Sequence, residues 1–112
     1  MTITPMDVER TLVELAARIE NGQRVVHQAD VAWTEAQREY ELAMAHALLR
    51  AEGPNVESRK AVATLATKEE RIRMDVAGLA LRDAQGRMRA LTAKADLWRS
   101  VGSSVRASMA VA

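Results

Sequence analysis

Apolar residues recur along most of the chain with the three-and-four spacing of amphipathic helices. The first such segment begins at Thr4, an expected N-cap that is followed by Pro5 at a favourable first helical position. We expect it to end at Asn21-Gly22, because both residues tolerate a left-handed conformation. The pattern predicts a short N-terminal helix over about residues 5–21, but it resumes at once, so a kink within a longer helix is the alternative. The apolar face of this segment consists of Val8, Leu12, Leu15 and Ile19.

A second helix is predicted over about residues 23–52, where Gly53-Pro54 supplies a helix stop. Its inner face keeps a strict alternation of three and four residues, which is the heptad pattern of coiled coils. The positions on this face are Val26, Ala29, Trp33, Ala36, Tyr40, Ala43 and Ala47.

A third, very long helix is predicted over about residues 56–107, after the N-cap Asn55. Two apolar stripes follow one another along it, and a step with spacing four through residues 76, 80, 84 and 88 joins them. Such a stutter locally unwinds a supercoil, so we expect a bend or a change of packing partner near residues 78–88. The first stripe consists of Val62, Leu65, Glu69, Ile72, Val76 and Leu79. The second consists of Ala84, Met88, Leu91, Ala95, Trp98, Gly102 and Val105.

These lengths predict an all-α fold, a helical hairpin within a single domain of residues 1–112, and self-association. A third helix of about 75 Å extends beyond a second helix of about 45 Å, at 1.5 Å per residue. Much of the apolar stripe would then face water, and a homo-oligomer with coiled-coil-like packing is the economical cover. The C-terminal half is the expected subunit interface, with Leu91, Trp98 and Val105 at its centre.

Composition agrees with a helical, non-membrane protein. The 112 residues contain 48% hydrophobic but only 3% aromatic residues, and no cysteine. The first residues do not resemble a signal peptide, and no apolar run approaches the ~20 residues that span a bilayer. We therefore expect a cytoplasmic protein.

Motifs for catalysis are not apparent. His27 and His46 have no convincing metal-ligand partners; His27 with Asp30 is at best a weak pair, and a surface histidine is the ordinary interpretation. No phosphate-binding loop or zinc-protease motif occurs. We expect no enzymatic activity, no cofactor and no metal.

Charge is distributed unevenly. Residues 82–112 carry six basic and two acidic side chains, or +4, whereas residues 1–81 carry ten basic and thirteen acidic ones, or −3. On a helical wheel Lys60, Lys68, Arg71, Arg82 and Arg89 point in one direction, while Arg87 with Lys94 and Arg99 with Arg106 form shorter rows. Such a ladder can track a phosphate backbone without reading sequence. A solvated face, with cations that complement the helix dipole, is the alternative.

Short motifs resemble those of a known family. They are Tyr40-Glu41-Leu42-Ala43-Met44-Ala45, Leu48-Leu49-Arg50-Ala51-Glu52-Gly53-Pro54, Arg59-Lys60-Ala61 and the ending Leu97-Trp98-Arg99-Ser100-Val101-Gly102-Ser103-Ser104-Val105-Arg106-Ala107. Their order is similar to that in the phage recombination mediator (UvsY-like) family. The resemblance implies a ring-forming helical oligomer that binds single-stranded DNA, displaces single-strand-binding protein and loads a RecA-like recombinase in an infected bacterium. It assigns DNA contacts to Arg59, Lys60, Arg99 and Arg106.

The full set of predicted nucleic-acid contacts combines the basic row on the helical wheel with the four residues implied by the resemblance. It is Arg59, Lys60, Lys68, Arg71, Arg82, Arg89, Arg99 and Arg106. The alternative function is a small phage adaptor or inhibitor that acts only through protein contacts, docking an amphipathic helix in a partner groove. A structural virion protein is a third possibility.

Overall fold

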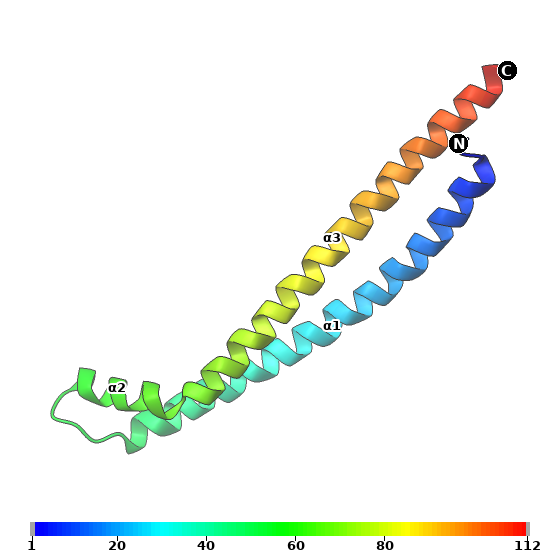
Figure 1. The fold of residues 1–112 in the computed structure, drawn as a ribbon. Coiled ribbons are helices and arrows are strands. Elements are labelled where there is room, and N and C mark those ends of the chain that lie inside the picture. Colours follow the sequence, from blue (N-terminus) through cyan, green and yellow to red (C-terminus); the bar gives the residue numbers. More distant parts are fainter. Residues whose placement is uncertain (1, 112) are drawn as a thin grey trace. The chain divides into compact units, whose positions relative to one another are not determined.

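The computed structural model describes residues 2–111, and this part of the chain contains three helices and no strand (Figure 1). The helices are α1 (Pro5–Arg50), α2 (Val56–Ala66) and α3 (Lys68–Val111). The predicted all-α fold with a long C-terminal helix is confirmed. The predicted helix boundaries are wrong at two places: α1 is not interrupted at Asn21-Gly22, and the helix expected over residues 56–107 is interrupted at Thr67.

Both predicted helix starts have the expected caps. The backbone N–H of Asp7 donates to Oγ1 of Thr4 at 3.2 Å, and the backbone N–H of Thr4 donates to Oδ2 of Asp7 at 3.0 Å. This reciprocal pair satisfies two backbone donors at the start of α1. At α2, the backbone N–H of Ser58 donates to Oδ1 of Asn55 at 2.8 Å. The side chains at these starts therefore fix where the helices begin.

Within residues 2–111 the contacts divide into two compact units. Unit 1 consists of residues 2–26 and 84–111, and unit 2 of residues 27–83. In each unit the paired helix segments run antiparallel. Residues further along α1 contact residues earlier in the second segment. Val8 lies by Gly102 and Gly22 by Met88 in unit 1, and Trp33 lies by Gly78 in unit 2.

Gly22 explains why α1 does not end where the local sequence predicted. A Cβ built on Gly22 would lie 3.2 Å from Cε of Met88 and 3.8 Å from Cδ1 of Leu91. The glycine also continues the heptad spacing between Ile19 and Val26. It is therefore a small residue at a core position, which admits a large side chain from α3, and not a helix stop.

The inner face of α1 is where the sequence placed it. Ala36 is buried, and the other predicted positions between Val26 and Ala47 are half-buried. In unit 1, Val8 and Leu15 of α1 and Ala84 and Ala95 of α3 are buried. The second predicted stripe of the long helix thus packs on the N-terminal segment of the same chain. The uninterrupted α1 therefore covers much of this stripe within the chain, and its predicted contact with other subunits stays a prediction.

The first predicted stripe does not pack on α1, contrary to expectation. Its large aliphatic side chains are exposed, whereas a different row of α2 and α3 packs on α1 in unit 2. This row keeps the three-and-four alternation into Ala84, so the buried face shows no stutter. The row includes small residues, which let two helices approach each other closely. The row consists of Ala63, Thr67, Glu70, Met74, Ala77 and Leu81, with Gly78 beside it.

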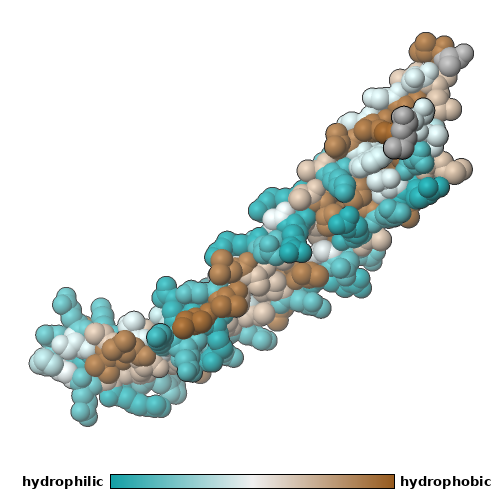
Figure 2. Space-filling model, viewed as in Figure 1, coloured by the Kyte–Doolittle hydropathy of each residue, from teal (hydrophilic) through white to brown (hydrophobic). Residues whose placement is uncertain are grey.

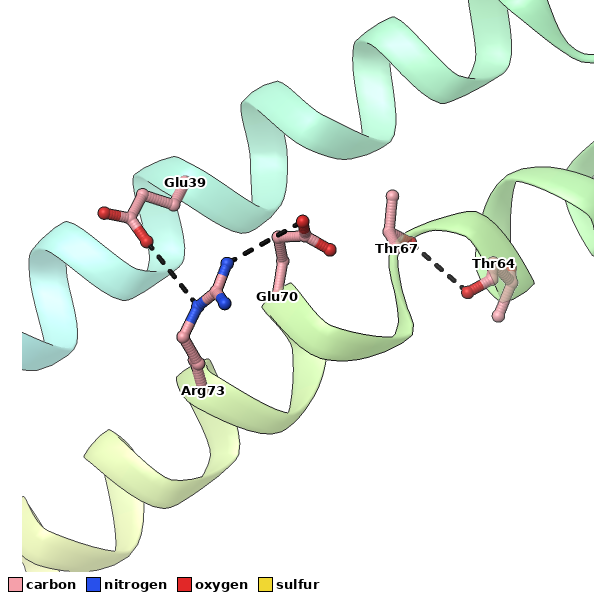
Figure 3. Close-up of polar contacts among 5 residues, drawn as sticks. All are labelled: Glu39, Thr64, Thr67, Glu70 and Arg73. Carbon is pink, nitrogen blue, oxygen red and sulfur yellow. Dashed lines mark hydrogen bonds and ion pairs between the residues drawn. The ribbon is translucent and has the colours of Figure 1, made fainter.

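Side-chain hydrogen bonds accompany the break at Thr67. The Thr67 hydroxyl donates to the backbone carbonyl of Ala63 at 2.9 Å. It also lies 3.3 Å from the carbonyl of Thr64 (Figure 3). Thr67 is 2% exposed and its backbone leaves the helical region at ψ 18°. A threonine that bonds back to the preceding turn competes with regular helix geometry. Helical bonding resumes at once, because the Arg71 N–H donates to the Thr67 carbonyl at 3.0 Å.

Candidate nucleic-acid interface

One side of unit 1 carries an open groove of about 680 Å³ between α1 and α3. Its floor is apolar, with Val25 from α1 and Met88 and Leu91 from α3. The groove lies at Gly22, where α1 has no side chain to fill the space beside Met88. We call it the cationic groove; its lining consists of Ala17, Arg18, Asn21, Gly22, Val25, Ala84, Arg87, Met88, Ala90, Leu91 and Lys94.

Every charged side chain in this lining is basic. Arg18 comes from α1, and Arg87 and Lys94 come from α3, one heptad apart; all three are exposed. No carboxylate contributes to the described lining. Residues that flank the packed face of paired helices usually carry opposite charges on the two helices. Cations from both helices therefore gather around one groove, which is a favourable place for an anion.

Unit 2 has the ordinary arrangement at the corresponding position. Nε of Arg73 on α3 lies 4.0 Å from Oε2 of Glu39 on α1, and Nη2 of Arg73 lies 3.7 Å from Oε1 of Glu70 (Figure 3). The hollow beside these residues also contains His46 and Arg50, so it is lined by both signs of charge. The uniform sign of the cationic groove is thus not a general property of the helix pair.

Of the eight predicted nucleic-acid contacts, none lines the cationic groove. Lys60, Lys68, Arg82 and Arg89 are exposed on α2 and α3. The other four have contacts within the chain, which reduces their availability to a ligand. These four are Arg59, Arg71, Arg99 and Arg106.

Arg71 illustrates such an internal contact. Its guanidinium lies 5.6 Å from the centre of the Tyr40 ring, and its Nε donates to Oδ1 of Asp75 at 3.4 Å. Interaction with the Tyr40 side chain, and secondly with Asp75, raises the pKa of Arg71 above its ordinary value. Both contacts lie within unit 2, so Arg71 has a local structural role.

Arg99 and Arg106 lie in a smaller hollow of unit 1 that also contains Glu9. Arg99 pairs with Asp96, and Nη2 of Arg106 donates to Oγ of Ser103 at 3.4 Å. This mixture of charges makes the hollow a weaker candidate for an anion than the cationic groove.

The sequence anticipated part of the groove. Arg87 and Lys94 form one of the short basic rows on α3. Arg18 was missed, because a wheel drawn for one helix carries no information about the facing helix. The predicted interface residues Leu91, Trp98 and Val105 are half-buried within unit 1. Their role in self-association stays a prediction.

Neither metal sites nor membrane spans are found in the described part of the chain. Among residues 2–111, no three His, Cys, Asp or Glu side chains are grouped so that they could hold a metal ion. In the same range, no helix combines the length and apolar character needed to cross a bilayer.

Comparison with known proteins gives no relative. No protein-family model matches the chain, and no curated protein or solved structure is significantly similar to it. The resemblance to phage recombination mediators therefore stays a prediction.

Proposed function

We propose that the protein binds single-stranded nucleic acid through its phosphates, without reading sequence, and that the cationic groove is the primary contact. The observation that carries this proposal is the cluster of Arg18, Arg87 and Lys94 around a groove that no carboxylate lines. Cations that neutralise phosphates release counterions, which supplies most of the affinity of nonspecific nucleic-acid binding. The apolar floor favours a single strand, whose bases are free to contact Met88 and Leu91.

The exposed cations of the predicted basic ladder lie outside the groove. Arg89 is in unit 1, and Lys60, Lys68 and Arg82 are in unit 2; on a helical wheel this row points away from Arg87 and Lys94, so it is a separate set of cations. Self-association would multiply every phosphate contact by the number of subunits, so a modest charge per chain becomes a strong electrostatic surface.

Direct binding measurements test the proposal. Fluorescence anisotropy with labelled oligo-dT at ~50 mM salt should detect binding by the wild-type chain. The double variant Arg18→Ala with Lys94→Ala should bind about tenfold more weakly. The matched control, Arg10→Ala with Arg38→Ala, removes the same charge from exposed positions of α1 outside the groove, and its affinity should stay within about twofold of wild type. Equal losses in both variants, or no binding by the wild type, would overturn the proposal.

The finer role as a recombination mediator in the cytoplasm of an infected bacterium rests on the sequence resemblance. It requires that the protein stimulate a RecA-like recombinase on DNA that is covered by single-strand-binding protein. A strand-exchange assay with and without the chain tests this role. Binding of oligo-dT without stimulation would leave a nucleic-acid-binding protein of another kind.

A second candidate function is an adaptor that acts only through protein contacts. It is favoured by the large aliphatic side chains that remain exposed on both units, some of which appear as brown patches in Figure 2. This alternative predicts that no salt-dependent nucleic-acid binding is found.

A further inference from the structure

Two hydrogen-bond donors of unit 2 meet beside Gly78. A Cβ built on Gly78 would lie 3.2 Å from Nε1 of Trp33, on α1, and 3.8 Å from Nη1 of Arg82, on α3. Arg82 follows Gly78 by four residues, so the two positions are neighbours on one face of α3. The indole nitrogen and the guanidinium therefore lie within 4 Å of a single point. We call Trp33 and Arg82 the donor pair.

Neither member of the donor pair is engaged inside the chain. Within residues 2–111, the indole N–H of Trp33 has no acceptor, and the guanidinium of Arg82 has no hydrogen-bond or ion-pair partner. Arg82 is exposed, whereas Trp33 is half-buried with its Nε1 accessible from the surface. The N–H of a tryptophan that packs inside a protein usually finds a hydrogen-bond partner. Both donors are thus open to an acceptor from outside the chain.

We propose that the donor pair binds a phosphate group, which accepts hydrogen bonds from the indole N–H of Trp33 and from the guanidinium of Arg82 at the same time. A phosphate carries several strong acceptor oxygens, so it can bridge donors that come from two helices. Arginine presents its N–H groups in a rigid fork that matches the geometry of phosphate. Because Gly78 has no side chain, the indole edge and the guanidinium reach the same place.

The charges on this side of unit 2 favour an anion. Three further cations of unit 2 point in the same direction as Arg82 along α2 and α3, namely Lys60, Lys68 and Arg71. Asp75 lies on this side of α3 as well, but it is paired with Arg71 at 3.4 Å. On α1, Asp30 lies one turn before Trp33, at an exposed position further from the packed face. The cations therefore outnumber the carboxylates, and Arg82 has no carboxylate partner among the described residues.

The donor pair is separate from the cationic groove. Trp33 and Arg82 belong to unit 2, whereas every residue that lines the groove belongs to unit 1. A phosphodiester of a nucleic-acid strand and a free phosphate present the same kind of oxygen to the two donors. The proposal therefore does not rest on nucleic-acid binding, and the two sources are distinguished by experiment.

The indole N–H signals in a proton–nitrogen correlation spectrum of the full chain test the site directly. The chain contains two tryptophans, so Trp98→Phe assigns the signal of Trp33. Titration with sodium phosphate at constant ionic strength should move the Trp33 signal saturably and leave that of Trp98 in place. Two hydrogen bonds to a charged group predict a dissociation constant on the order of 1 mM. A parallel titration with oligo-dT shows whether the phosphodiester of a strand occupies the same site.

Two arginine variants complete the test. Arg82→Ala should weaken phosphate binding about tenfold, because it removes one of the two donors. Arg38→Ala is the matched control, since Arg38 is an exposed arginine of unit 2 outside the donor pair, and it should bind phosphate like the wild type. Circular dichroism should show unchanged helicity for both variants, because both side chains are exposed.

The outcomes separate the two sources of phosphate. A shift of the Trp33 signal with sodium phosphate alone supports the site with a free phosphate as its ligand, and a shift with oligo-dT supports it with a strand. A Trp33 signal that moves with neither ligand, or that moves equally with sodium chloride, would overturn the proposal. Equal phosphate affinity of Arg82→Ala and wild type would overturn it as well.

Discussion

Replacing Gly78 with alanine tests how closely α1 and α3 pack in unit 2. A Cβ at Gly78 would lie 3.2 Å from Nε1 and 3.4 Å from Cδ1 of Trp33. Both atoms belong to a rigid indole ring, so the ring or the helix must move. Alanine in a helix interior gains about 0.8–1 kcal/mol over glycine, but overpacking of a filled site costs about 1–3 kcal/mol. We expect Gly78→Ala to change the free energy of unfolding by between about zero and −2 kcal/mol.

Gly86→Ala on the same helix is the control. The nearest atom to its added Cβ is Nη2 of Arg89 at 3.7 Å, an ordinary contact with the end of a flexible side chain. This variant should gain about 0.8–1 kcal/mol in stability from helix propensity alone.

Urea unfolding followed by circular dichroism measures both variants, at one protein concentration. The two should differ by about 1–3 kcal/mol. Trp33→Leu removes the ring, and in that background Gly78→Ala should become less destabilising or stabilising, which a double-mutant cycle quantifies. If Gly78→Ala stabilises the wild-type chain as much as Gly86→Ala does, Trp33 does not pack on Gly78 and the account of unit 2 is wrong.

Three further changes test the caps and the packed face. Asn55→Ala should cost about 1 kcal/mol on urea unfolding, because the N–H of Ser58 loses its acceptor; an unchanged midpoint would contradict this role. Glu70→Leu should stabilise unit 2 by about 1 kcal/mol, since Glu70 occupies a packed position and its Oε2 is buried without a hydrogen-bond partner; a loss of stability would show that the carboxylate is needed. Hydrogen bonds from Thr4, first from its backbone, lower the pKa of Asp7, so this group adds stability above its unfolded pKa near 3.8, and that stability is lost as the pH falls through the lowered folded pKa. Asp7→Asn should therefore lose stability at neutral pH but not at strongly acidic pH, and equal losses at both would refute the assignment.

Much of the fold could be predicted from local sequence. Thr4 and Asn55 cap helices as their residue types indicate, and the heptad row from Val26 to Ala47 faces inward. The end predicted at Asn21-Gly22 was wrong, because the role of Gly22 depends on Met88, a residue far away in the sequence. Helix-stop propensities depend on neighbouring residues in the sequence, so they do not include a contact with a distant residue.

The packed face of α2 and α3 shows a second limit. Hydrophobicity favoured the row with Ile72 and Val76, but the row that packs on α1 is the one with Ala63 and Thr67, on the opposite face. When two rows share the same spacing, the sequence alone does not decide which one meets the neighbouring helix. The candidate site has the same limit, because Arg18 joins Lys94 only when α1 packs on α3.

The salt dependence of oligo-dT binding is the most direct test of the proposed function. For a single strand, the logarithm of the binding constant should fall with the logarithm of salt concentration at a slope of about −0.7 for each phosphate neutralised. Arg18, Arg87 and Lys94 together predict a slope of about −2, or steeper where exposed cations elsewhere take part. A slope near zero, or no binding at ~50 mM salt, would contradict the account.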